Sequence, residues 1–445
     1  MATQTPTTTR SVNPPDSVGS GIRVRIAVGF TLIAVVASLV GLVASGGSYE
    51  PAPNGLPDSG PFVGWLLPVL GAIGFGAAMA CIGWLLLAGF LDPSAGKKVV
   101  SKRGRAAMLR ASGAAAIWCV ISLIASVFTL ANILGVDLAT AAAPGTFTTY
   151  AWDVSDVRTL LISAVLAAAV AIGAVLSVSL TGTTIWLALA LVAVAAPSTA
   201  GHAVGLGDHG LALVNSVAHA VAATLWVGGL IALGATVWPK AQTVGVAAQR
   251  FGYLAIASVV ILTASGVVNA YVRLGAPADL FTSGYGRLVV AKTLLLIALI
   301  ATAAWIRRRL LPNLDGEQPR RTFAKVAALE LTLMSIATGL GVALSLTAPT
   351  RVAVQFATQA EALLGFEFPA APTVMSVVFG WDLDVLFFVM GIAACVYYTI
   401  GVMRLRSRGD AWPVSRTICW FIGWSIVIWA TNAGIATYSE VSVGI

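Results

Sequence analysis

Long apolar segments alternate with short polar ones along the 445-residue chain. Each apolar segment is hydrophobic on every side of a helix instead of alternating residue by residue, which excludes a transmembrane β-barrel. Crossing ~30 Å of hydrocarbon takes roughly 20 apolar residues in a helix, because the backbone must satisfy its own hydrogen bonds there. The pattern predicts an all-α, polytopic transmembrane helical bundle of about eleven spans, at 25–46, 62–91, 106–131, 158–180, 184–200, 210–237, 252–273, 287–306, 323–347, 379–403 and 415–437.

The distribution of basic residues predicts a cytoplasmic N-terminus. With that orientation, all but five of the 26 Lys and Arg residues fall on the inner side, the exceptions being Arg158, Arg273, Arg287, Lys292 and Arg351. Such an excess on one side is typical of cytoplasmic loops. If one span were missed or added, every later loop would change sides and the basic residues would no longer collect on the inner side. The asymmetry therefore supports the number of spans as well.

Composition agrees with a multi-pass protein of the cytoplasmic membrane that contacts the lipid bilayer. Hydrophobic residues make up 58% of the chain and charged residues 10%, against about 25% charged in soluble proteins. The net charge of +8 reflects the basic inner loops, and no basic run is interleaved with exposed aromatic residues. We therefore expect no nucleic-acid partner.

Polar stretches divide the chain into predicted units. Residues 1–22, rich in Thr, Ser and Pro, are expected to form a disordered cytoplasmic tail. The units that follow are an N-terminal transmembrane extension of about five spans (23–200), a second transmembrane domain (201–349), an outer loop (350–378) and two final spans (379–445). These last spans end without a charged tail, so we expect the chain to be a fragment of a longer protein.

The three histidines of the chain cluster at its predicted outer face. His202 ends the fifth span, Asp208 and His209 open the sixth, and His219 lies ten residues further in, roughly 15 Å along a helix axis. Imidazole binds Cu, Zn, Fe and Ni, and Asp208 offers a hard oxygen ligand, so these four residues are our candidate metal ligands. Asn215 shares the His219 face one turn earlier. The alternatives are that His202 and His209 are solvated helix ends and that His219 only hydrogen-bonds a neighbouring helix.

A few other polar residues fall inside predicted spans. Asn269 and Arg273 lie in the outer part of the seventh span, Lys292 in the outer third of the eighth, and Glu330 in the inner half of the ninth. Charged residues inside a membrane are functional candidates by default, but a structural ion pair between Lys292 and Glu330 is an equal alternative. Met334, near Glu330, is interpreted as a packing residue.

One stretch resembles the copper-resistance protein D (CopD) family. The run from His219 through Trp226, Gly228, Gly229 and Leu230 is similar to that family's H…W-x-G-G-L pattern. Further positions agree in order: Gly201-His202, Phe251, Ser265-Gly266, Asn269, Tyr285-Gly286-Arg287, Lys292, Glu330 and Pro349. The resemblance covers about 200–350. It implies a metal-binding role for His202 and His219, while Trp226, Gly228 and Gly229 are expected to serve in packing.

The region from Trp381 to Trp424 resembles the opening of the CtaG family, assembly factors of caa3-type cytochrome c oxidase. The matching residues are Tyr397, Arg404, Arg406, Gly409, Asp410, Trp412, Pro413, Arg416 and Thr417. The histidine-rich helix of that family would follow Tyr438, and this chain stops at Ile445 before reaching it, so any metal ligands of that unit are absent from the chain.

Together the resemblances imply a copper ion as the cargo, carried across the membrane or delivered to an oxidase. The protein partners implied are cytochrome c oxidase subunits or a periplasmic copper chaperone, and we expect no enzymatic activity. The residues alone would accept Zn or Ni equally well. Two other hypotheses stay open: a b-type haem electron-transfer protein, which needs two histidines at similar depth on facing helices, and a metal-free scaffold for oxidase assembly.

Overall fold

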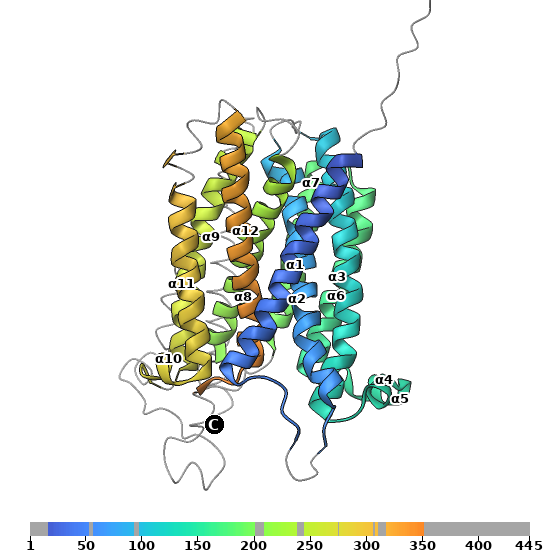
Figure 1. The fold of residues 1–445 in the computed structure, drawn as a ribbon. Coiled ribbons are helices and arrows are strands. Elements are labelled where there is room, and N and C mark those ends of the chain that lie inside the picture. The colour runs from blue at the N-terminus through green and yellow to red at the C-terminus, as the bar shows by residue number, and fades with distance from the viewer. Residues whose placement is uncertain are drawn as a thin grey trace, which may run out of the picture.

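The computed structural model is a bundle of long helices (Figure 1). It describes residues 17–52, 57–92, 98–200, 209–237, 244–274, 276–305, 308–309 and 317–350. The helices have these bounds: α1 (Ser17–Ser45), α2 (Pro61–Leu86), η2 (Leu87–Leu91), α3 (Lys102–Leu134), α4 (Leu138–Ala142), α5 (Pro144–Tyr150), α6 (Ser155–Leu176), α7 (Leu180–Ala195), η3 (Ala196–Thr199), α8 (His209–Val237), α9 (Val244–Arg273), α10 (Asp279–Thr282), α11 (Gly284–Trp305) and α12 (Glu317–Leu346).

The predicted all-α membrane bundle is confirmed. In the described ranges, nine helices are long and apolar enough to cross a membrane. They correspond in order to the first nine predicted spans, with ends that agree within about four residues. The tenth and eleventh spans, the preceding loop and the CtaG-like residues lie outside the described residues.

Short polar signals set the helix ends. Ser101 begins α3 and Ser179 begins α7, and each hydroxyl accepts a hydrogen bond from the backbone N–H three residues later, at 2.9 Å. These caps satisfy donors that the first helical turn leaves free. Gly135 ends α3 with φ of 63°, a left-handed conformation that glycine adopts without strain.

The connection between α3 and α6 contains two short helices, α4 and α5 (Figure 1). Asp137 caps α4 by accepting from the Thr140 backbone N–H at 3.0 Å and from its hydroxyl. These hydrogen bonds lower the pKa of the Asp137 carboxyl group. The small polar residues of this segment therefore form helix caps and turns.

The first helices of the chain pack directly against the later ones. α1 packs along α12, and α2 packs along α8 (Figure 1). A Cβ atom on Gly83 of α2 would lie 1.9 Å from the Gly228 carbonyl oxygen of α8, and one on Gly228 would lie 2.3 Å from that of Met79. Two glycines thus allow backbone contact between α2 and α8, as small residues do in membrane bundles.

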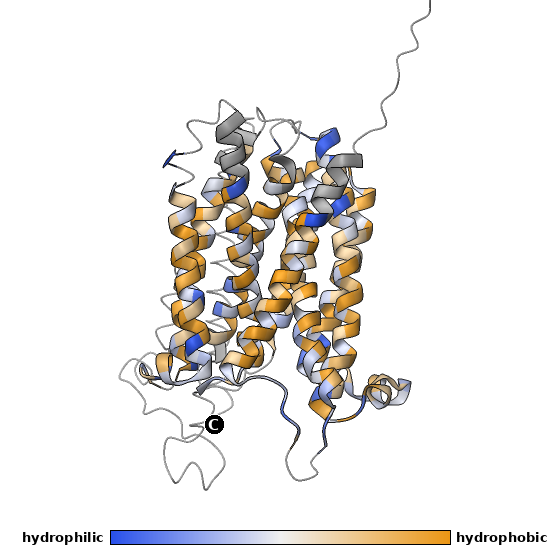
Figure 2. Ribbon diagram, in the orientation of Figure 1, coloured by the Kyte–Doolittle hydropathy of each residue, from blue (hydrophilic) through white to orange (hydrophobic). Residues whose placement is uncertain are grey.

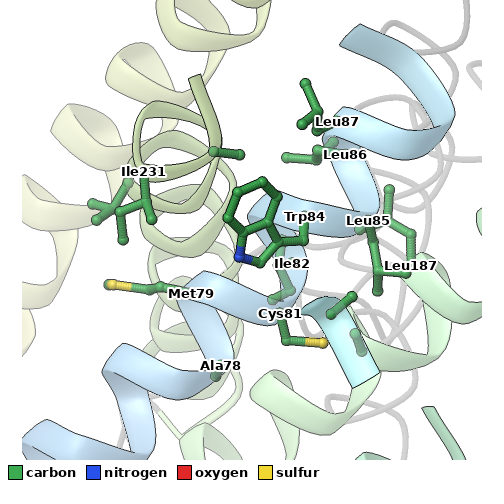
Figure 3. Close-up of a cluster of buried hydrophobic side chains, with 14 of the residues drawn as sticks. Ala78, Met79, Cys81, Ile82, Trp84, Leu85, Leu86, Leu87, Leu187 and Ile231 are labelled. Atoms are coloured by element: carbon green, nitrogen blue, oxygen red, sulfur yellow. The ribbon is translucent and has the colours of Figure 1, made fainter. Parts of the chain in front are cut away.

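The centre of the bundle is apolar. In Figure 3, Met79 and Trp84 extend from α2 toward Ile231 of α8, whereas Leu85 extends toward Leu187 of α7. All five side chains are buried. One face of α2 therefore contacts α8 and another contacts α7, which places α2 at the core.

Polar residues gather at the helix ends and are sparse between them (Figure 2). At the predicted inner end, Arg105 donates to the carbonyls of Ala174 and Ser177 that end α6, at 3.3 and 2.8 Å. Arg250 similarly donates to the carbonyls of Phe90 and Asp92, at 3.4 and 3.3 Å. Cations at helix C-termini satisfy free carbonyls and complement the helix dipole.

Candidate functional site

A ladder of polar side chains joins α8 and α9 in their outer halves. Arg273 donates from Nη1 to Asn269 Oδ1 at 2.8 Å and from Nη2 to Ser216 Oγ at 3.0 Å. One turn deeper, His219 Nδ1 lies 3.0 Å from Ser265 Oγ. The α9 members lie four residues apart, so they share one helix face. The two antiparallel helices thereby share a partly buried, hydrogen-bonded strip that begins near the outer surface and reaches His219.

The hydrogen bonds around Ser265 determine which ring nitrogen of His219 is available. The Ser265 hydroxyl has a carbonyl acceptor, Leu262 O, at 3.3 Å. When it donates there, its oxygen accepts the Nδ1–H of His219, and the lone pair is left on Nε2. That is the neutral form in which histidine binds metals, and a fixed Nδ1 partner is usual for such ligands.

Two further residues, Lys292 and Tyr285, add a positive charge and a hydroxyl group beside this ladder. Arg273 and Lys292 both lie within electrostatic range of His219. The Tyr285 hydroxyl group interacts with Arg273, and Tyr285 is buried. The Lys292 side chain crosses from α11 to α12, where a Cβ on Gly341 would lie 3.3 Å from its Nζ. No described carboxylate acts on Lys292, so the outer half of the bundle is electropositive.

Glu330 lies in a separate, inner part of the bundle. It is 6% exposed, and no charged group or hydrogen-bond donor of the described residues contacts its carboxyl group. Gly341, where Lys292 ends, is eleven residues further along α12, about 16 Å at 1.5 Å per residue. Lys292 and Glu330 therefore do not form the ion pair that the sequence left open.

The Trp-x-Gly-Gly run of α8 serves packing. Trp226 is 5% exposed. Gly228 faces α2, and a Cβ on Gly229 would lie 2.3 Å from the Phe251 ring of α9. The two glycines thus fix α8 against α2 and α9, which holds His219 opposite Ser265.

The other predicted ligands are described less completely. His209 begins α8, ten residues before His219, and only its backbone is described. His202 and Asp208 lie outside the described residues.

Asn215 is buried beside the ladder, and its neighbour Ser216 contacts Arg273. Within the described ranges, no three His, Cys, Asp or Glu side chains are grouped closely enough to hold a metal ion. Among the predicted ligands, His219 is the one whose side chain the structure describes, and its Nε2 has no described partner there.

Sequence reasoning missed the roles of Ser216 and Ser265 as hydrogen-bonding partners. The sequence could have indicated the role of Ser265, because Ser265, Asn269 and Arg273 follow at four-residue intervals on one predicted span and so share a helix face. Nothing in the sequence indicated that Ser216 would meet Arg273, since that contact depends on the register of α8 against α9.

Two segments of the chain match known families. Residues 245–344 match the family described as Copper resistance protein D, a range that includes Ser265, Asn269, Lys292 and Glu330 and begins after His219. Residues 396–445 match Cytochrome c oxidase caa3 assembly factor (Caa3_CtaG). Both agree with the resemblances found in the sequence.

The similar curated proteins are uncharacterised. One from Mycobacterium bovis and one from Mycobacterium tuberculosis are each 26% identical over 442 residues, covering 98% of this chain and 63% of the relative. A third, from Mycobacterium leprae, is 30% identical over 94 residues, covering 21% of this chain and 14% of the relative. This chain thus spans 63% of the length of the first two relatives.

No solved structure matches the chain. The protein is a multi-pass membrane protein with one segment matching Copper resistance protein D and another matching Cytochrome c oxidase caa3 assembly factor, and these matches indicate a copper-related membrane function.

Proposed function

We propose that the protein moves copper across the cytoplasmic membrane, or delivers it there for cytochrome c oxidase assembly, and that the α8–α9 ladder receives the ion at the outer face. The observation that carries this proposal is the orientation of His219, whose Nδ1 contacts Ser265 at 3.0 Å while Nε2 has no described partner. An imidazole inside a membrane span is costly unless it faces a cavity, a partner or a ligand.

The geometry supplies one ligand, so further ligands are required. His202, His209 and Asp208 are the proposed partners of His219, since all three belong to the segment that leads into α8. The family matches supply the choice of copper, because imidazole and carboxylate would also accept zinc or nickel. In this proposal the protein is a carrier, not an enzyme, and oxidase subunits or a periplasmic copper chaperone exchange copper with it.

Copper binding to the purified full chain tests the site. We expect His219→Ala and His202→Ala to lower the bound copper and to reduce copper accumulation in cells that express the chain. Ser258→Ala, which alters a buried serine of α9 about two turns deeper than Ser265, should change neither the bound copper nor the copper accumulation. Unchanged copper binding in both histidine variants would contradict the proposed site.

Two measurements separate the alternatives. A Soret absorption band in the purified protein would favour the b-type haem hypothesis. That hypothesis needs two histidines at similar depth, and His209 precedes His219 by ten residues of α8, about 15 Å along the helix axis. Co-purification with oxidase subunits that persists in the histidine variants, without copper binding, would favour the metal-free scaffold.

A further inference from the structure

We infer that the bundle contains a second cargo site in its inner half, where the thioethers of Met79 and Met334 and the carboxylate of Glu330 bind Cu(I). This inference rests on the proposed copper function and extends it to residues outside the histidine cluster. It concerns the interface between α12 and α2, which the apolar pattern of the sequence marks only as packing.

The α12 residues of this site share one buried face. Glu330, Met334 and Thr338 follow at four-residue intervals, which places them in line along a helix. They are 6%, 2% and 7% exposed. Thr338 Oγ1 lies 3.9 Å from Met79 Sδ, so this face of α12 is turned toward α2.

The lone pairs of Met79 Sδ are available. The hydroxyl proton of Thr338 has a much closer acceptor, the Met334 carbonyl oxygen at 2.8 Å. The contact with Met79 Sδ is therefore weak and leaves that thioether free to act as a ligand. Figure 3 shows Met79 extending from α2 to the side opposite Cys81, so the Cys81 thiol is not part of the site.

The buried carboxyl group of Glu330 is a second, independent argument for a cation site here. Glu330 is a membrane-embedded acid, more than nine-tenths buried and without a described partner. Such residues are costly and mark ion pathways. Met334 lies one turn of helix from Glu330 on one side and one turn from Thr338, the neighbour of Met79 Sδ, on the other. In the proposed site, the cation at the Met334 thioether therefore lies between the Glu330 carboxylate and Met79 Sδ.

Charge and ligand type select the ion. A monovalent cation and one carboxylate give a neutral pair, which the bilayer tolerates better than the net charge that a divalent ion would leave. Thioether sulfur is a soft ligand that favours Cu(I) over Zn²⁺ or Ni²⁺. The inner site should therefore distinguish Cu(I) from the divalent metals that the outer imidazole accepts.

The test uses X-ray absorption of the purified full chain loaded with Cu(I) under a reductant. We expect sulfur scattering at copper in the unaltered protein and its loss in the double variant Met79→Leu, Met334→Leu, which nearly conserves volume. Met108→Leu is the matched control, because Met108 is fully buried but contacts Thr183 elsewhere in the bundle. It should retain the sulfur signal.

Affinity measured by competition with bicinchoninate gives a second readout. Glu330→Gln, which keeps the side-chain shape, should weaken Cu(I) binding about tenfold or more, the loss seen even for partners outside the first shell of ligands. Zn²⁺ binding should not change. Thermal melting of each variant in detergent checks that the bundle is folded.

Failure of the inner site is distinguishable from failure of the proposed function. If His219→Ala abolishes copper accumulation while the double methionine variant keeps its sulfur scattering, the inner site is refuted and the outer one stands. An unaltered protein that shows no sulfur at copper also refutes the inner site. Retention of the sulfur signal in His219→Ala together with its loss in the double methionine variant supports it.

Discussion

At the scale of single residues, Ser265 controls the chemistry of His219. In the proposed site, the Ser265 hydroxyl donates to the Leu262 carbonyl and accepts the Nδ1–H of His219, which leaves the lone pair of Nε2 for copper. We predict that Ser265→Ala weakens copper binding about tenfold, as loss of a ligand-orienting partner typically does. Competition titration of the purified chain would measure this. Ser258→Ala, at a serine equally buried on the same helix, is the control, and equal losses in the two variants would show that the effect is structural.

The sequence identified the chemically important residue types at this scale but only part of their environment. His219, Asn269, Lys292 and Glu330 were singled out because a charged or polar residue is conspicuous inside an apolar span. Met79 and Thr338 were not, since neither breaks the apolar pattern. Their meeting depends on the register between α2 and α12, which hydropathy does not encode.

At the scale of helices, the contact between α2 and α8 depends on the absence of side chains at Gly83 and Gly228. We predict that Gly228→Ala destabilises the protein by about 1–3 kcal/mol, the usual cost of overpacking, because its Cβ would lie 2.3 Å from the Met79 carbonyl oxygen. Thermal melting in detergent measures the change. Gly113→Ala on α3, where a Cβ would meet nothing within 4 Å, should be neutral or mildly stabilising. A Gly228→Ala variant as stable as this control would contradict the close backbone contact between α2 and α8.

The helices themselves were predictable because a span needs only length and apolarity. Their ends were predicted to within about four residues, whereas the caps Ser101 and Ser179, which the hydropathy pattern does not mark, set the actual starts of α3 and α7. Their neighbours in space were not predictable. The packing of α1 along α12 joins residues as far apart in sequence as Ser45 and Thr347, 302 positions. It depends on small residues such as Gly339, where an added Cβ would lie 2.2 Å from the Ala34 carbonyl oxygen.

At the scale of the whole molecule, buried charge is segregated by depth. Arg273 and Lys292 lie in the outer half of the bundle, and Glu330 lies in the inner half without a described counter-ion. A cation passing inward would therefore leave an electropositive region and approach a carboxylate. The positive charges of Arg273 and Lys292 should raise the energy barrier to this movement and lower the affinity of the inner site for a cation.

The size of this effect can be estimated for Lys292. Its Nζ lies beside Gly341, about 16 Å along α12 from Glu330, and at an effective dielectric constant of about 20 the repulsion of a monovalent cation there is about 1 kcal/mol. We predict that Lys292→Gln strengthens Cu(I) binding at Glu330 about fivefold. Lys292→Arg keeps the charge and should leave the affinity unchanged. Competition titrations of both variants at low ionic strength would measure the difference, and a Lys292→Gln affinity equal to or weaker than that of Lys292→Arg would show that the charge of Lys292 does not act on the inner site.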